Sequence, residues 1–227
     1  MAELDGRVII VTGGFGALGS AVAKKVAAAG AEIACLDHAE DPSGPGFRIG
    51  SLDLADDGIC RRAFEQVADQ LGPLYGLVNV AGGFEMGSLA ESGLDPWDRM
   101  YRTNLRTALA ACHSALPFFL AAKSGRVVNV GAAVAAKGLA EMGAYAASKS
   151  GIARLTESLA EEMRGQGITV NAVLPSIIDT PANRAAMPQA DASKWTSPDD
   201  IAEVIVFLLS ERARAVTGAL INIPGSN

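Results

Sequence analysis

The chain has 227 residues, 49% of them hydrophobic, and a formal net charge of −6. This length and composition fit one globular domain, residues 1–227, with a large core. Basic residues occur in runs no longer than two, so neither nucleic acid nor an anionic membrane surface is an expected partner. The N-terminus lacks the regions of a signal peptide, and no apolar run approaches the ~20 residues that span a bilayer, which predicts a cytoplasmic protein.

Three cysteines, Cys35, Cys60 and Cys112, lie far apart in apolar or helical patterns. An odd number at such spacing indicates neither a disulfide framework nor a metal site. We therefore expect buried thiols in a reducing compartment, and no bound metal.

The first predicted strand and helix flank a glycine-rich turn. Residues 7–12 are rich in β-branched side chains, and a helical pattern extends to Ala29. Between them, Gly13, Gly16 and Gly19 form the pattern G-x-x-G-x-x-G. Glycines there permit a tight turn and the close approach of a pyrophosphate, whose charge is favoured at a helix N-terminus. The position after the first strand favours dinucleotide binding over a purely structural turn.

The next predicted strand, residues 32–36, ends at Asp37, roughly twenty residues beyond the glycine turn. A carboxylate at that place accepts hydrogen bonds from the adenosine ribose hydroxyls and repels a 2′-phosphate. The sequence therefore predicts NAD, with NADH preferred over NADPH. The alternative is that Asp37 only opens the polar loop at residues 37–46.

The rest of the chain continues the alternation of strands and helices. In chain order we expect a strand at 47–49, a helix at 55–71, a strand at 75–80, a long helix at 96–122 with a kink or break near Pro117, a strand at 125–130, a helix at 143–164, a strand at 168–174, an irregular segment at 178–196, a helix capped by Ser197 that ends near 209, and a strand at 219–223.

This alternation predicts an α/β fold, a Rossmann-type doubly wound seven-stranded parallel sheet with helices on both faces, in a single domain. In such sheets the ligand lies outside the carboxyl ends of the strands. The loops that begin at Gly13, Asp37, Ala81, Gly131 and Pro175 all follow predicted strands. We therefore expect one crevice lined by these loops, with a substrate loop at about 176–196.

Tyr145 and Lys149 lie four residues apart in a helix-favouring run, so they share a helix face. A nearby ammonium favours the phenolate and lowers the phenol pKa toward the range useful for proton transfer. This pair is a candidate acid/base device, although the same spacing also arises by chance in many helices.

Taken together, these features resemble the short-chain dehydrogenase/reductase superfamily along the whole chain. The resemblance is carried by Thr12–Gly19, Asp37, Asp53–Leu54, Asn79–Gly82, Asn104, and Tyr145 with Lys149. It implies that Tyr145 transfers the proton, that Lys149 binds the nicotinamide ribose and lowers the tyrosine pKa, and that Asn104 holds a water in a proton relay. A mid-helix asparagine otherwise faces solvent or bonds locally. The implied cofactor-binding residues are Gly13, Phe15, Gly16, Leu18, Gly19, Asp37, Asp53, Leu54, Ala81, Gly82, Lys149, Pro175, Ile178 and Thr180.

The sequence departs from the commoner members at three places. It has Ala17 where they have glycine, and Ser176 where a glycine follows the proline of the sixth strand. Their catalytic serine, thirteen residues before the tyrosine, is Ala132 here. Alanine cannot hydrogen-bond a substrate carbonyl, and losing one such donor typically costs ~10²–10³ in turnover. We do not expect Ser148 or Ser150, which flank the lysine, to replace it.

One branch that lacks this serine, dihydropteridine reductase, is similar to the chain in more detail. The similarity lies in Gly13–Ser20, in Val80–Gly83 followed by the aromatic Phe84, in Gly131–Ala132, and in Asp179–Thr196. The branch usually has an indole in place of Phe84, and Asn104 follows the commoner pattern. The resemblance implies reduction of a quinonoid dihydropterin with NADH. The implied substrate residues are Ala132, Phe84, Asn183, Met187 and Trp195.

The leading hypothesis is therefore an NADH-dependent reductase of a quinonoid dihydropteridine-like substrate, with Tyr145 as proton donor. One alternative is an NAD-dependent alcohol dehydrogenase or ketoreductase that acts on another carbonyl substrate. Another is a cofactor-binding sensor whose chemistry has lapsed with Ala132. The two long helices, 96–122 and 143–164, carry more alanine and leucine than one face on the sheet requires, so we expect a homodimer or homotetramer.

Overall fold

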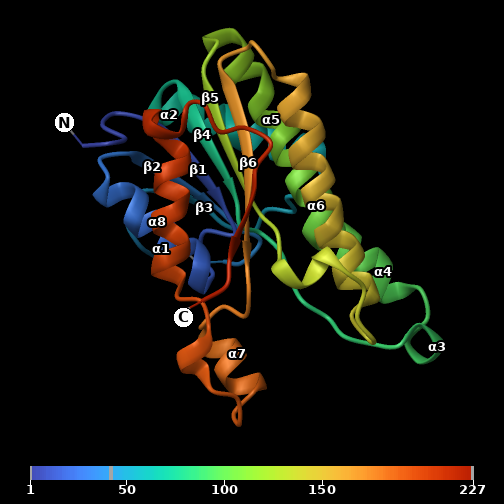
Figure 1. Ribbon diagram of the computed structural model, residues 1–227. Helices are drawn as coiled ribbons and strands as arrows, with labels where there is room; N and C mark the ends of the chain where they lie inside the picture. The colour runs from blue at the N-terminus through green and yellow to red at the C-terminus, as the bar shows by residue number, and fades with distance from the viewer. Residues whose placement is uncertain (1, 41–42, 226–227) are drawn as a thin grey trace.

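The computed structural model describes residues 2–40 and 43–225, and Figure 1 shows a twisted sheet between two layers of helices. The sheet has seven strands in the order β3-β2-β1-β4-β5-β6-β7, and every pairing is parallel. This confirms the predicted doubly wound α/β fold. Residues 41–42 of the expected polar loop lie outside the described residues.

The strands are short and apolar because most of them are buried on both faces, as parallel sheets require. All five residues of β1 and all six of β4 and of β5 are buried. The strands span β1 Val8–Thr12, β2 Glu32–Leu36, β3 Phe47–Ile49, β4 Leu74–Asn79, β5 Gly125–Val130, β6 Ile168–Pro175 and β7 Leu220–Ile223.

Helices on the two faces of the sheet close two separate apolar cores. On one face lie α1 (Ala17–Ala28) and α8 (Pro198–Leu209), and on the other lie α2 (Asp57–Leu71), α5 (Thr107–Ala122) and α6 (Gly143–Glu162). The predicted start of α8 is confirmed, because the Ser197 hydroxyl accepts hydrogen bonds from the amides of Asp199 and Asp200. Pro198 occupies the first helical position.

The long helix expected at 96–122 is interrupted, but not at Pro117. It consists of α4 (Asp95–Met100), a π-helical turn at Tyr101–Arg106, and α5. Pro117 lies inside α5, on its exposed side, where the carbonyl that lacks a proline N–H partner faces solvent. The expectation of a break at Pro117 is therefore wrong, and the irregular turn lies about a dozen residues earlier.

The segment expected to be irregular, 178–196, contains a short helix. The Thr180 hydroxyl accepts a hydrogen bond from the amide of Asn183, and Pro181 begins α7 (Pro181–Ala186). A 3₁₀ turn follows at Ala192–Lys194. Figure 1 shows α7 projecting from the edge of the sheet where the strands end.

One helix among the described residues, Asp95–Ala122, has the length and mean hydropathy to cross a membrane, by length and composition alone. A core helix of a soluble protein passes the same test, and α5 packs against α2 and the sheet. In the most apolar 18-residue stretch of Asp95–Ala122, 39% is buried inside the protein. Pairing of this helix and α6 with another subunit stays a prediction.

The three cysteines are free and buried, as predicted. Burial raises the pKa of the Cys60 thiol to about 11 and that of Cys112 to about 12, so neither forms a reactive thiolate near neutral pH. Among residues 2–40 and 43–225, no group of three or more histidine, cysteine or acidic side chains is placed to hold a metal ion.

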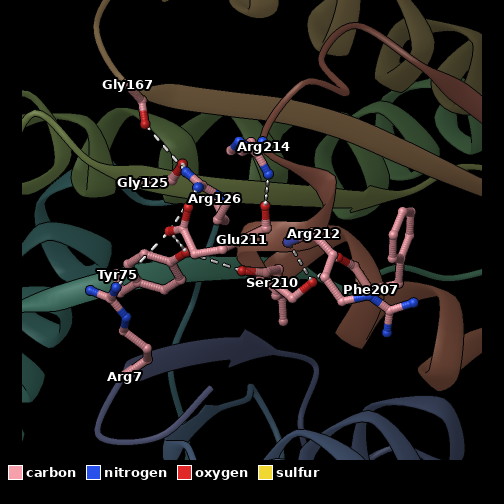
Figure 2. Close-up of polar contacts among 11 residues, drawn as sticks. Arg7, Tyr75, Gly125, Arg126, Gly167, Phe207, Ser210, Glu211, Arg212 and Arg214 are labelled. Carbon is pink, nitrogen blue, oxygen red and sulfur yellow. Dashed lines mark hydrogen bonds and ion pairs between the residues drawn. The ribbon is translucent and has the colours of Figure 1, made fainter. Parts of the chain in front are cut away.

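A buried arginine connects the amino ends of the strands to the segment after α8 (Figure 2). Arg126, 4% exposed, donates to the Gly125 carbonyl at 2.8 Å, to the Gly167 carbonyl at 3.2 Å and to Glu211 Oε1 at 3.1 Å. The same carboxylate oxygen accepts the Tyr75 hydroxyl at 3.0 Å. Glu211 therefore balances a charge that is otherwise buried, at the end of the sheet opposite the crevice.

Replacing Glu211 with glutamine leaves the Arg126 guanidinium without its counter-charge. Because Arg126 is buried while Glu211 is partly exposed, we expect Glu211→Gln to lower the free energy of unfolding by about 1–3 kcal/mol in denaturant titrations. Glu157→Gln, which removes an exposed ion pair with Arg154, is the matched control and should cost less than about 0.5 kcal/mol. Equal losses in the two variants would contradict the assignment.

Candidate active site

The turn between β1 and α1 can be made only with glycine at several positions. Gly13 has φ +66°, and a Cβ added at Gly19 would lie 2.0 Å from the Gly13 carbonyl oxygen. A Cβ at Gly14 would lie 2.6 Å from the Cβ of Cys35 on β2. Gly14 was not among the predicted site residues, because its neighbour across the sheet cannot be identified from spacing alone. The contacts bring α1 against the strands and leave its N-terminus open to a ligand.

A cavity of about 700 Å³ lies outside the carboxyl ends of the strands. This confirms the predicted convergence of several loops on one crevice. Of the predicted site residues, those that line the cavity are Gly13, Phe15, Gly16, Leu18, Gly19, Asp37, Asp53, Leu54, Ala81, Gly82, Phe84, Tyr145, Lys149 and Ile178. Those that do not line it are Asn104, Ala132, Pro175, Thr180, Asn183, Met187 and Trp195.

Asp37, 5% exposed, follows β2 at one side of the cavity. Its Oδ2 accepts a hydrogen bond from the Phe15 amide at 3.0 Å, and its Oδ1 accepts one from the Ala39 amide at 3.1 Å. His38 Nδ1 lies 3.0 Å from the same Oδ1. These hydrogen bonds fix the Asp37 carboxylate against the glycine turn, at the wall of the cavity. Asp37 is therefore not simply the first residue of a polar loop.

At the same side of the cavity, Asp53 forms an ion pair with Arg102. The second Asp53 oxygen accepts a hydrogen bond from the Ala55 amide at 3.1 Å, and Arg106 Nε donates to the Ala55 carbonyl at 3.2 Å. Both arginines come from the π-helical turn. The sequence prediction missed Arg102, since nothing in its spacing connects it with Asp53, 49 positions earlier.

A chain of buried polar side chains joins three central strands to α6. Asn79 Nδ2 donates to Asn129 Oδ1 at 2.9 Å, and Asn129 Nδ2 donates to Thr156 Oγ1 at 2.9 Å. Thr12 Oγ1 donates to Asn79 Oδ1 at 3.4 Å, and Thr156 completes the chain on the Ile152 carbonyl. Because every member has a partner, the network holds α6 at one position on the sheet.

Asn104 lies within the π-helical turn and is 1% exposed, so it does not face solvent as a mid-helix asparagine usually does. Its Oδ1 accepts the Gly83 amide at 2.8 Å, and its Nδ2 donates to the Gly83 carbonyl at 3.1 Å and to Ser148 Oγ at 2.9 Å. Ser148 in turn donates to the Tyr145 carbonyl at 2.8 Å. The side chain therefore joins the segment after β4 to the helix that carries Tyr145.

Tyr145 and Lys149 both reach the cavity from the first turns of α6. The lysine Nζ donates to the Val130 carbonyl at 2.9 Å. Burial raises the pKa of Tyr145 to about 12 and lowers the pKa of Lys149 to about 8. In the protein alone the tyrosine pKa is therefore shifted upward by desolvation, opposite to the direction expected from the lysine. The phenol remains a protonated acid at neutral pH.

No serine hydroxyl stands where the superfamily places one. Ala132, 7% exposed, follows β5. Ser148 is engaged with Asn104, and Ser150 Oγ donates to the Ala135 carbonyl at 2.7 Å. Neither lines the cavity, which agrees with the expectation that they do not replace the missing serine.

Beside Tyr145, Phe84 forms an apolar wall of the cavity. The two rings meet edge to face, with centroids 4.8 Å apart and an interplanar angle of 77°. Phe84 is 58% exposed, so it belongs to the mouth of the cavity and not to the core. Its exposed ring leaves an apolar surface beside the tyrosine.

The predicted substrate residues after β6 are placed outside the cavity. Trp195 is 7% exposed, and the backbone that follows it pairs with Ile177. Asn183 Nδ2 donates to the Ile178 carbonyl at 2.8 Å, so its amide helps to hold the start of α7. Their assignment to the substrate stays a prediction, as does that of Met187.

The site fits an elongated dinucleotide. The glycine turn leaves backbone room for a pyrophosphate at the N-terminus of α1, Asp37 offers acceptors for ribose hydroxyls, and Lys149 with Tyr145 lies at the far end. A protonated phenol beside a lysine supplies a proton donor, and no metal is needed for that role. The fold and the site together define a dinucleotide-binding oxidoreductase.

Comparison with known proteins agrees with this class. A family model described as short chain dehydrogenase matches residues 7–191. A D-threitol dehydrogenase of Mycolicibacterium smegmatis is 32% identical, over 98% of this chain and 93% of the relative. An inactive 2-(S)-hydroxypropyl-CoM dehydrogenase 2 of Xanthobacter autotrophicus is 31% identical, over 90% of this chain and 98% of the relative. A short-chain dehydrogenase/reductase structure from Mycobacterium ulcerans has a TM-score of 0.90 at 24% identity, over 97% and 89% of the two chains.

The chain belongs to the short-chain dehydrogenase/reductase family. It is accordingly an oxidoreductase, and the family uses NAD(P)(H) as cofactor.

Gly82 tests the contact of Asn104 and Lys149 with the segment after β4. A Cβ added there would lie 2.7 Å from Asn104 Oδ1 and 3.2 Å from Lys149 Nζ, both buried and hydrogen-bonded. We expect Gly82→Ala to lower kcat by about 10²-fold, because small displacements of positioned groups are costly. Gly138→Ala, where nothing lies within 4 Å of the added Cβ, is the control. Unchanged kcat in Gly82→Ala would show that this packing does not position the groups.

Replacing Lys149 tests how much the burial of its charge lowers the stability of the fold. Below pH 8 the lysine is charged in folded and unfolded chains alike, and the folded chain bears the cost of burial. We expect Lys149→Met to be inactive but more stable at pH 7, by up to about 3 kcal/mol. Between pH 8 and 10.5 the folded wild type has lost the Lys149 proton, which its unfolded chain retains. The free energy of unfolding of the wild type therefore rises with pH, and the stability difference between Lys149→Met and the wild type becomes smaller.

Urea titrations of both proteins across this pH range measure the effect. Lys24→Met, at an exposed position of α1, is the matched control and should show no such pH-dependent gap. A gap between wild type and Lys149→Met that is constant from pH 7 to pH 10.5 would rule out the buried charge as its source.

Proposed function

We propose that this protein is an NADH-dependent reductase whose substrate is a flat, conjugated ring of the quinonoid dihydropteridine type. When bound, the reduced nicotinamide supplies a hydride to the substrate. Tyr145 donates the accompanying proton, and Lys149 holds the cofactor ribose. The observation that carries the proposal is the missing serine hydroxyl: Ala132 stands at the usual position, and Ser148 and Ser150 bond elsewhere and do not line the cavity, whereas the Tyr145 phenol does.

A substrate that is already electron-poor suits a site that lacks the serine hydroxyl. Reduction of an ordinary ketone builds negative charge on one oxygen, and two donors stabilise that charge better than one. A quinonoid ring spreads the incoming electrons over several atoms, so a single proton donor suffices. The apolar edge of Phe84 beside Tyr145 gives such a ring a surface to lie against.

The preference for NADH rests on Asp37. Its carboxylate is held at the cavity by two backbone amides, so it cannot turn away from a phosphate on the ribose. Repulsion between the two anions disfavours NADPH.

A second candidate is reduction or oxidation of an alcohol/carbonyl pair. It is favoured by the relatives, since the 32% identical protein is a D-threitol dehydrogenase. A third is a cofactor-binding protein without turnover, which is favoured by the loss of the serine and by the relative whose name calls it inactive.

Steady-state oxidation of NADH and NADPH with quinonoid dihydropterin and with a panel of ketones separates these candidates. We expect turnover of the pterin, a higher kcat/KM with NADH, and a loss of about 10²–10⁴-fold in Tyr145→Phe. Turnover of ketones alone would establish the second candidate. Cofactor binding without turnover, unaffected by Tyr145→Phe, would establish the third, and a higher kcat/KM with NADPH would overturn the assignment of Asp37.

Ala132→Ser provides a matched gain-of-function comparison in the same assays. The new hydroxyl restores a donor for a carbonyl oxygen, so we expect ketone reduction to rise about tenfold or more. Pterin reduction should change by less than about threefold, because that substrate does not depend on the donor. An equal rise for both substrates would contradict the proposed reason for the missing serine.

A further inference from the structure

Arg102 lines the cavity and forms an ion pair with Asp53, in the segment at 52–55. The pyrophosphate site is on β1, at the centre of the sheet, and Tyr145 with Lys149 lies on the β5 side. The opposite half of a dinucleotide must therefore extend over β2, past Asp37, toward the segment at 52–55. That segment and Arg102 enclose the place where the base of the second nucleotide lies.

The ion pair between Arg102 and Asp53 contributes little to the fold. Its side chains are 59% and 49% exposed, and exposed pairs are worth only about 0–1 kcal/mol. By contrast, Arg126 shows how this chain uses an arginine structurally, buried and bonded to several partners. The exposed pair at the rim of the cavity thus has a surface free for a ligand.

Charge also favours a cation at this position. Two carboxylates, Asp37 and Asp53, line the same half of the cavity, and the dinucleotide brings a negatively charged pyrophosphate. Without Arg102 the site would repel part of its own ligand. Asp53 holds the guanidinium at the rim and is itself neutralised by it.

We propose that Arg102 is a recognition residue for the adenine ring of the cofactor, lying flat against the base while Asp53 holds its guanidinium in place. The planar, weakly hydrated guanidinium stacks on aromatic faces, which an ammonium does not do. Leu54 supplies an apolar contact from the segment at 52–55. The proposal rests on the dinucleotide cofactor of the proposed function, but not on the choice of substrate.

The test is the affinity of variants for fragments of the cofactor, measured by calorimetry or ligand fluorescence without turnover. Arg102→Ala should weaken NADH and ADP-ribose by about tenfold and leave reduced nicotinamide mononucleotide unchanged. Arg102→Lys should lose an intermediate part of this affinity, because it keeps the charge but not the flat surface. The melting temperature of both variants should stay within about 2 °C of the wild type.

Arg164→Ala, which breaks an exposed ion pair with Glu161 on the other side of the molecule from the cavity-lining residues, is the matched control and should bind all ligands as the wild type does. Unchanged ADP-ribose affinity in Arg102→Ala, or full affinity in Arg102→Lys, would overturn the stacking role while leaving the proposed reductase intact. Failure of the wild type itself to bind NADH and ADP-ribose would overturn both proposals.

Discussion

The contact between Gly13 and Gly19 is the constraint on which the site depends. With 2.0 Å between the Gly13 carbonyl oxygen and the place of a Gly19 Cβ, any side chain at position 19 would push α1 away from β1. The N-terminus of α1 would then leave the carboxyl edge of the sheet, and the anion site made by its free amides would be lost. Close packing of backbone on backbone thus sets the position of a charged ligand.

The opposite end of the site uses burial in a different way. The polar chain from Asn79 to Thr156 fixes α6 on the sheet, and α6 in turn holds Lys149 where its charge is poorly solvated. Because the members of this polar chain are hydrogen-bonded and Lys149 Nζ is itself bonded to the Val130 carbonyl, the lysine is held in its buried position. The buried charge of Lys149 lowers the stability of the fold but keeps a cation near Tyr145. Such a compromise is common at active sites.

Much of this architecture could be predicted because it follows from local rules. The β-branched runs, the glycine turn and the acid after the second strand each depend on neighbours in sequence. The π-helical turn could not be predicted, because the hydrogen-bond register within a helix does not change the spacing of apolar residues. It turns Asn104 to the core and Arg102 to the cavity. The resemblance indicated Asn104 as a site residue but not its contacts with Gly83 and Ser148, and Arg102 was missed. The partners Asn129 and Thr156 also escaped, because a buried polar pair is defined only once strands and helices have been placed.

The absence of the serine at position 132 has to be considered together with the protonation state of Tyr145. A site that lacked the serine and also held a phenolate would have neither a carbonyl donor nor an acid. Here burial keeps Tyr145 protonated, and Asn104 with Ser148 holds the turn that carries it. One donor is therefore retained with its surroundings intact, which is what a reductase requires if its substrate does not concentrate charge on one oxygen.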